Sequence, residues 1–72
     1  MVKINKLKIK INGKNRLIKR KTTLKTLLTS FKLPMNKIAI EINEQIMDKK
    51  KFSKIELKNN DKIEIVHFIG GG

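Results

Sequence analysis

The sequence has no cysteine, no tryptophan and no tyrosine, and it holds a single proline and a single histidine among its 72 residues. Without cysteine, the protein has no disulfide, no thiolate metal ligand and no cysteine nucleophile. Its apolar runs are only a few residues long, far short of the ~20 residues that span a bilayer. The start "MVKINKLKIK" also lacks the continuous apolar segment of a signal peptide. These features predict a soluble protein of a reducing compartment, the cytoplasm or an organelle stroma.

Positive charge is abundant, with a net charge of +12. Such an excess often marks a protein that binds nucleic acid or an acidic membrane. Here, however, the lysines are spread along the chain, mostly at positions that alternate with apolar residues, and only "DKKKFSK" forms a local run. No Trp or Tyr is available to stack on bases. We therefore expect a solvated basic surface, with neither a nucleic acid nor a membrane as partner. A small basic nucleic-acid-binding module remains an alternative.

The N-terminal part has the pattern of a β-hairpin. "LKIKIN" alternates apolar residues with lysines, which is typical of a strand with one buried face. Asn12 and Gly13 follow, and this dipeptide favours the positive backbone angles of a tight hairpin turn. "RLIKR" then predicts the returning strand. Ile18 is the expected inward residue of that strand, with Leu17 as the competing choice.

The next segment, "KTTLKTLLTSFKLP", changes to a helical period. Thr22 or Thr23 can cap the first N–H groups of the predicted helix, and Pro34 stops its continuation shortly after Leu33. The helix should lie across one face of the sheet. Its apolar stripe consists of Leu24, Leu27, Leu28 and Phe31.

The second half returns to alternation in "KIAIEIN", and "NEQI" predicts a turn into a short strand around Ile46. The following "DKKKFSKIELKNND" is expected to be irregular, with Phe52, Ile55 and Leu57 as anchors in the core. A closing turn is predicted over residues 59–61. The final strand is "KIEIVHFI".

This order of elements predicts an α+β fold in which one helix packs on one face of a mixed five-stranded sheet. The first and last strands flank the helix in sequence, so they can pair in parallel. That is the β-grasp arrangement of ubiquitin-like proteins. The chain is short enough for only one domain, residues 1–72. Within it we expect an N-terminal extension over residues 1–6 and a flexible glycine tail over residues 70–72.

Side-chain chemistry offers no catalytic or metal site. His67 is the only histidine and sits in a predicted strand, and the six acidic residues are scattered. "IGGG" is followed by no helix that would hold a phosphate. What remains is the terminal carboxylate, which is ionised at neutral pH and is a poor acyl donor until it is activated. Joining it to AMP requires a partner enzyme that holds ATP and magnesium, so we expect no cofactor bound to this chain.

Glycine suits such a tail because it adds no bulk, tolerates unusual backbone angles and carries no nucleophile. Alone, three glycines are a weak signal, since termini are often frayed. Their position directly after a core strand of a predicted β-grasp domain makes the signal specific.

Four segments together, "INGK", "TTLKTLL", "IAIEIN" and "NDKIEIVHFIGGG", resemble the ThiS family, the sulfur carriers of thiamine thiazole biosynthesis. The resemblance runs from about Leu7 to Gly72. It implies that an E1-like enzyme (ThiF) adenylates Gly72 and that the adenylate becomes a thiocarboxylate with the help of a sulfur donor enzyme. Thiazole synthase (ThiG) then takes the sulfur. In this comparison Gly72 bears the acyl group, Gly71 completes the diglycine, Gly70 extends the stalk, and the protein is a co-substrate rather than an enzyme.

Related carriers remain as alternatives. The small subunit of molybdopterin synthase typically has a proline-bearing segment before its diglycine, and "VHFIGGG" lacks one, which favours the thiazole branch. A tRNA-thiolation carrier or a ubiquitin-like modifier would share the tail chemistry. Two features depart from the family pattern: the basic "MDKKKFSK" segment and the N-terminal "MVKINK".

Alternation in the last strand also predicts a docking face. If Ile63 and Ile65 point toward the helix, then Glu64, Val66 and Phe68 point to the open face of the sheet. An exposed apolar pair next to the tail would anchor a partner enzyme. The alternative is that a loop of the same chain covers these side chains.

Overall fold

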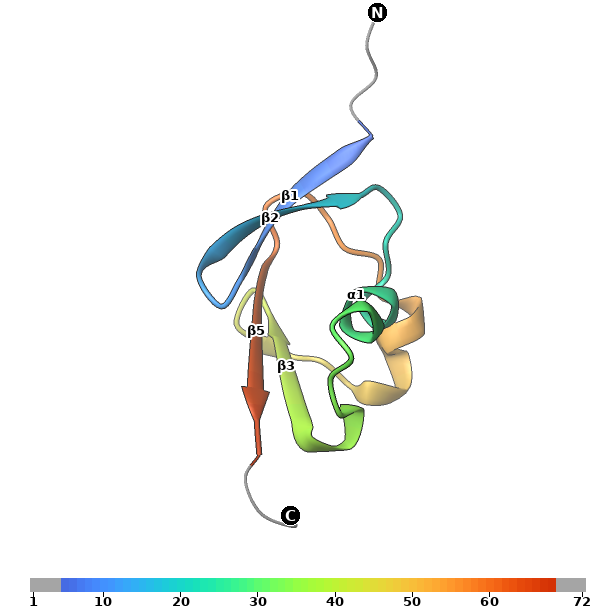
Figure 1. Ribbon diagram of the computed structural model, residues 1–72, viewed down its shortest axis with the longest axis vertical. Coiled ribbons are helices and arrows are strands. Elements are labelled where there is room, and N and C mark those ends of the chain that lie inside the picture. The colour runs from blue at the N-terminus through green and yellow to red at the C-terminus, as the bar shows by residue number, and fades with distance from the viewer. Residues whose placement is uncertain (1–4, 69–72) are drawn as a thin grey trace, which may run out of the picture.

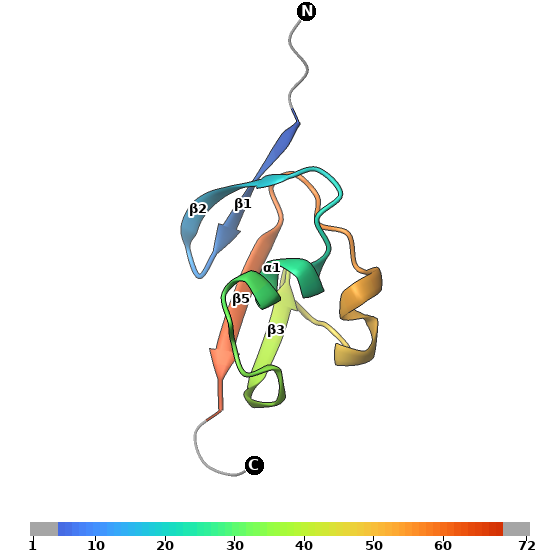
Figure 2. The same cartoon turned by 45° about the vertical axis from the view of Figure 1, so that its right-hand side comes forward.

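The structure is a computed structural model that describes residues 5–68. Its sheet has five strands in the order β2-β1-β5-β3-β4, and the helix α1 (Leu24–Ser30) lies against one face (Figures 1 and 2). Two 3-10 helices, η1 (Met35–Lys37) and η2 (Lys49–Lys54), flank β3 and β4 in sequence. The strands are β1 (Lys6–Ile11), β2 (Lys14–Lys19), β3 (Ile38–Ile42), β4 (Gln45–Ile46) and β5 (Lys62–His67).

The N-terminal hairpin is confirmed, and its turn has the predicted backbone. Asn12 and Gly13 have φ angles of +48° and +84°, the left-handed values that a two-residue turn between antiparallel strands requires. Ile18 is buried opposite Leu7, whereas Leu17 is 63% exposed. Ile18 is therefore the inward residue of β2. Strand β1 begins at Lys6, the last residue of the predicted N-terminal extension.

Strand β5 is the centre of the sheet, as the β-grasp arrangement requires. It pairs in parallel with β1, with Ile11 opposite Ile63, and antiparallel with β3, with Ile40 opposite Ile65. Figure 1 shows β5 running between these two strands. The side chain of Asn12 extends the parallel pairing beyond β1, because its Oδ1 accepts the backbone N–H of Ile65 at 2.7 Å. A residue of the hairpin turn thus also fixes the position of β5.

The helix begins as expected and ends earlier than expected. Thr23 is its N-cap, and the Thr23 hydroxyl oxygen accepts the backbone N–H of Thr26 at 3.2 Å. The helix stops at Ser30, ahead of Pro34, because Phe31 closes the last turn with a bond from its N–H to the Leu28 carbonyl oxygen. Lys32 then adopts a left-handed φ of +57°, which turns the chain away from the helix axis.

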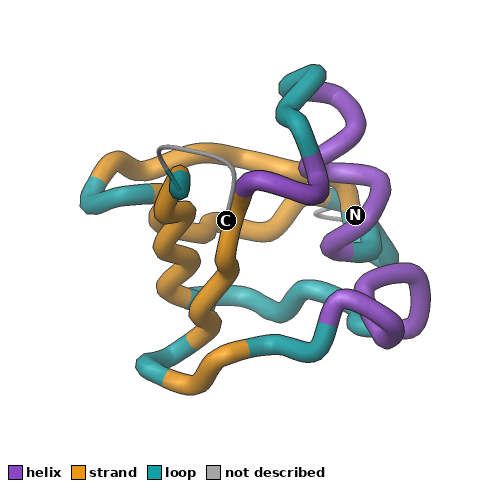
Figure 3. Tube along the Cα trace, turned by 90° about the horizontal axis from the view of Figure 1, so that it is seen from below, coloured by secondary structure: helices purple, strands orange, loops and turns teal. Residues whose placement is uncertain are grey.

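The core lies between the helical layer and the sheet (Figure 3). Phe31, Ile55 and Ile65 are half-buried and pack against it. The predicted anchors Phe52 and Leu57 are both buried. The buried residues of the core are Leu7, Ile9, Ile18, Leu24, Leu27, Leu28, Ile38, Ile40, Ile42, Phe52, Leu57 and Ile63.

One expectation is corrected: residues 48–61 are not irregular throughout, because η2 occupies Lys49–Lys54. Asp48 caps this helix, with its Oδ1 accepting the backbone N–H of Lys50 at 2.9 Å. The segment after η2 is tied to the start of α1, since Leu24 donates its N–H to the Ile55 carbonyl oxygen at 2.8 Å. The predicted closing turn is present and includes Asn60 at a φ of +72°. The short helix η1 was not expected from the sequence.

Candidate docking surface and tail exit

Alternation along β5 places Glu64 and Val66 on the open face of the sheet, as predicted. Ile63 is buried and Ile65 is half-buried on the helix side. Between and after them, Glu64 and Val66 are exposed, Val66 by 48%, and Phe68 just beyond the strand is 49% exposed. Loops of the described chain therefore leave much of both apolar side chains accessible. A role for Glu64, Val66 and Phe68 in docking stays a prediction.

Phe68 is held by two contacts from other segments. Its backbone N–H donates to the carbonyl oxygen of Lys37 at 2.8 Å, directly after the pairing of His67 with Ile38. The ammonium of Lys49 lies 5.8 Å from the centre of the Phe68 ring, within the range of a cation–π contact. The chain therefore leaves the sheet at a fixed position, beside the start of β3 and the start of η2. Gly70, Gly71 and Gly72, the predicted adenylation site and stalk, lie outside the described residues.

Neighbouring strands extend the apolar part of this face. Val66 is paired with Ala39 of β3, and the two residues lie side by side on the open face. Ile46 of β4 is opposite Glu41 and is 76% exposed. We define the docking surface as Ala39, Ile46, Val66 and Phe68 with the adjoining Glu64. Sequence alternation identified the β5 members but missed Ala39 and Ile46, whose positions depend on the register between strands.

Metal-ligating side chains are not grouped in the described part of the chain. Residues 5–68 contain no group of three or more His, Cys, Asp or Glu side chains placed to hold a metal ion. His67, the lone histidine, is exposed at the end of β5 opposite Ile38. No helix within the same range is long and apolar enough to cross a membrane.

Comparison with known proteins agrees with this geometry. The family model for the ThiS family matches residues 9–72, a range that includes the three terminal glycines. The sulfur carrier protein ThiS of Bacillus subtilis is 40% identical over 65 residues, which cover 89% of this chain and 98% of that protein. A thiazole synthase of Paramagnetospirillum magneticum is 36% identical over 66 residues, covering 92% of this chain but only 20% of that longer protein.

A solved structure has the same fold. The crystal structure of the thiamine biosynthesis protein ThiS from Geobacter metallireducens superposes with a TM-score of 0.79 at 23% identity, over 92% of this chain and all of that one. The five-stranded mixed sheet of this chain, with one helix on one face, is the ubiquitin-like β-grasp. The fold, the exposed end of β5 and the family match through the terminal glycines lead to one conclusion: this chain belongs to the ThiS family.

Proposed function

We propose that this protein is a sulfur carrier for the synthesis of the thiamine thiazole, and that it is a co-substrate of other enzymes rather than an enzyme. The observation that carries this proposal is the similarity to Bacillus subtilis ThiS over 98% of that protein, together with a family match that reaches Gly72. The terminal carboxylate is the group that fits the chemistry.

The proposed chemistry has three steps. An E1-like, ThiF-like enzyme joins the Gly72 carboxylate to the α-phosphate of ATP, with magnesium, and releases pyrophosphate. Sulfide (HS⁻) supplied by a sulfur donor system then attacks the acyl carbon of the adenylate and expels AMP, which leaves a thiocarboxylate on Gly72. Thiazole synthase finally takes the sulfur, and water restores the carboxylate. ATP and magnesium belong to the partner enzyme.

The fold supports this role by presenting the tail from a rigid base. The backbone of Phe68 is fixed by its bond to Lys37, and Gly72 is the fourth residue after it. A chain of four residues spans at most about 14 Å when extended, which is enough to enter the active site of a docked enzyme. Gly70 and Gly71 would thread that channel, because glycine adds no side-chain bulk.

The similarity to thiazole synthases supports a ThiG-like enzyme as the sulfur acceptor. In the Paramagnetospirillum protein, a segment similar to this chain forms part of a polypeptide named thiazole synthase. A carrier and the enzyme that uses its sulfur must meet, and a shared polypeptide would keep them together. We expect these encounters in the cytoplasm or an organelle stroma, where ATP is available.

An intact-mass measurement tests the proposal. The protein is incubated with a ThiF-like enzyme, ATP, magnesium and a sulfur donor system. The expected product has the mass change that corresponds to replacement of one oxygen atom by sulfur, and alkylation of the thiocarboxylate confirms its position at Gly72. An unchanged mass with an enzyme that modifies Bacillus subtilis ThiS in parallel would contradict the proposal.

A further inference from the structure

The open face of the sheet carries two like-charged pairs in neighbouring rows. Lys10 of β1 is the cross-strand partner of Lys62 of β5, and Glu41 of β3 is the partner of Glu64 of β5. Lys62 and Glu64 are alternate residues of one strand, so both pairs face away from the helix. The structure thus places a basic row directly beside an acidic row.

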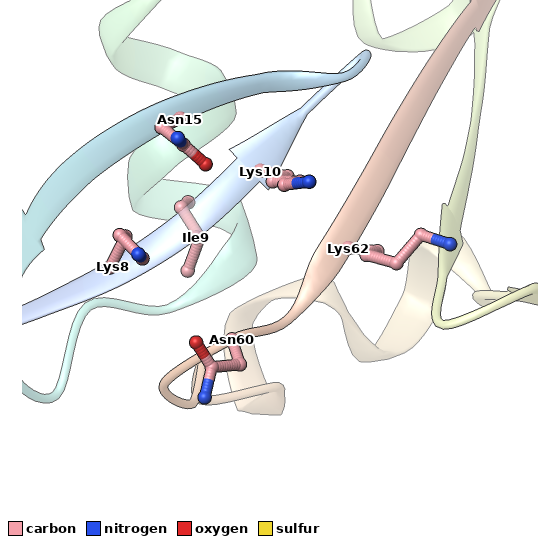
Figure 4. A pocket seen from close by; sticks show the side chains of 6 residues that line it. All are labelled: Lys8, Ile9, Lys10, Asn15, Asn60 and Lys62. Atoms are coloured by element: carbon pink, nitrogen blue, oxygen red, sulfur yellow. The ribbon is translucent and has the colours of Figure 1, made fainter.

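The basic row is part of a larger positive region. Lys6 and Lys8 alternate with Lys10 along β1, and Lys19 of β2 is opposite Lys6. A depression of about 390 Å³ lies here, and Figure 4 shows the side chains around it. Its lining residues are Lys8, Ile9, Lys10, Asn15, Asn60 and Lys62. Ammonium and amide donors therefore line the depression, which suits carboxylate groups from another molecule.

The third row is apolar and adjoins the exit of the tail. Val66 and Ala39 form this row, and Phe68 follows it at the point where the described chain leaves the sheet. Along β5 the order on the open face is therefore basic at Lys62, acidic at Glu64 and apolar at Val66.

The pairing of like charges does not stabilise the sheet itself. Like charges directly opposite each other on adjacent strands destabilise the pairing. Alternation of lysine and glutamate across β1, β5 and β3 would have been the favourable arrangement for the isolated domain. The repulsion within each pair is relieved, however, when the surface of a second molecule places acidic groups over the lysine row and basic groups over the glutamate row. The rows therefore have the form of one half of a complementary interface.

We propose that the three rows fix the orientation in which this protein docks on the ThiF-like adenylating enzyme, an inference that rests on the proposed function. We call this arrangement of rows the orientation code. The enzyme surface carries an acidic, a basic and an apolar strip in the same order, with the apolar strip beside the channel that receives the tail. Apolar contacts at Val66 and Phe68 supply affinity but little direction. The charged rows supply direction, because a reversed placement sets like charge against like.

Other occupants suit this face less well. A nucleic acid would meet the Glu41 and Glu64 carboxylates directly beside the lysines, and it has no need of the apolar row. A second copy of this chain brings its own net charge of +12 against the first. A protein surface with mixed charge is the partner that uses all three rows.

The test depends on a variant that exchanges the rows without changing net charge. Two Lys→Glu changes at Lys10 and Lys62 and two Glu→Lys changes at Glu41 and Glu64 cancel, so the net charge stays at +12. Steering by net charge alone predicts nearly normal binding for this fourfold variant. The orientation code predicts the weakest binding of all, with a dissociation constant for the ThiF-like enzyme raised by well over tenfold at low salt.

Two double variants keep the proposal testable if the fourfold variant does not fold. Lys10→Glu/Lys62→Glu and Glu41→Lys/Glu64→Lys each reverse one row, and each should weaken binding by about tenfold with a normal melting curve. The matched control is Lys25→Glu/Lys54→Glu, which changes net charge as the first variant does but lies on exposed positions of α1 and η2. Its binding should change by less than about threefold, the small effect expected of charges outside an interface.

The wild-type protein separates this inference from the proposed function. ATP–pyrophosphate exchange with the wild-type protein tests the proposed function itself. If no exchange occurs, both the proposed function and the orientation code are contradicted. Normal exchange with wild type, combined with normal binding by the folded row variants, would overturn the code alone. It would also be overturned if the row exchange altered only binding to a labelled RNA, or only a self-association seen by sedimentation.

Discussion

The backbone N–H of Phe68 donates to the carbonyl oxygen of Lys37 at 2.8 Å, one residue beyond the end of β5. This bond joins the end of the last strand to the residue before β3, so the exit of the tail is set by the sheet. The exposed ring of Phe68 and the exposed side chain of Val66 lie at the same exit. A partner that contacts these two side chains therefore binds beside the point where the described chain ends.

Removal of apolar side chains at this exit should weaken partner binding and leave the fold intact. We expect Phe68→Ala and Val66→Asp to reduce affinity for the ThiF-like enzyme by about 2 kcal/mol or more, because an aromatic ring near an interface centre contributes on that scale. Titrations of Phe68→Ala at low and high salt should give the same loss, since apolar contacts are not screened, whereas the carboxylate that Val66→Asp introduces should make the loss for that variant depend on salt. Leu17→Ala, which truncates an exposed leucine on β2 opposite Lys8 and away from Val66 and Phe68, is the comparison variant and should lose much less affinity.

The outcome that would contradict this prediction is specific. Phe68→Ala could lower the melting temperature strongly while the molecules that stay folded bind with unchanged affinity. In that case Phe68 stabilises the fold and the docking surface lies elsewhere.

Truncation of core residues should destabilise the protein strongly. Leu27 on α1 and Ile40 on β3 are buried on the two sides of the core. We expect Leu27→Ala and Ile40→Ala each to lower the free energy of unfolding by ~2–5 kcal/mol, through lost burial and the cavity that remains. Urea melts provide the measurement. A loss below about 0.5 kcal/mol, the size typical of surface sites such as Leu17, would place either residue outside the core.

The side chain of Asn12 should stabilise the pairing of β1 with β5. Its Oδ1 accepts the Ile65 N–H at 2.7 Å while its backbone adopts a φ of +48°. Asn12 Nδ2 also donates to the Ile65 carbonyl oxygen at 3.4 Å, so Asn12→Gly keeps the left-handed turn but removes both side-chain bonds to Ile65, and we expect a loss of about 1 kcal/mol in unfolding free energy. Asn12→Asp retains the acceptor and should lose less. Equal stability of wild type and Asn12→Gly in urea melts would show that these bonds contribute nothing.

Much of the fold follows from local patterns. The alternation in "LKIKIN" and "KIAIEIN" and the helical spacing of Leu24, Leu27 and Leu28 each report on which face of an element is buried. Segment 48–61 was predicted less well, because a 3-10 helix rich in lysine has neither the period of an amphipathic helix nor that of a strand. Its anchors Phe52 and Leu57 were nevertheless correct, since large apolar side chains in a polar segment are usually buried.

The candidate site was only partly predictable, because several of its features depend on the register between strands. The exposure of Val66 follows from alternation within β5 alone. The pairing of Glu41 with Glu64 and of Lys10 with Lys62 requires knowledge of three strands at once. The contacts of Phe68 with Lys37 and Lys49 join segments that are distant in sequence and have no local signal.

The most direct test of the carrier function is ATP–pyrophosphate exchange with a variant that lacks Gly72. The ThiF-like enzyme should exchange pyrophosphate into ATP with wild-type protein, because the proposed reaction forms the acyl adenylate on the Gly72 carboxylate reversibly. Deletion of Gly72, or replacement of Gly71 by a bulky residue, should abolish exchange, since the carboxylate then cannot reach the α-phosphate in the correct position. Both variants should melt like wild type, because they leave all the buried core residues of the described range, 5–68, unchanged. Undiminished exchange with the deletion variant would contradict the assignment of Gly72 as the reacting residue.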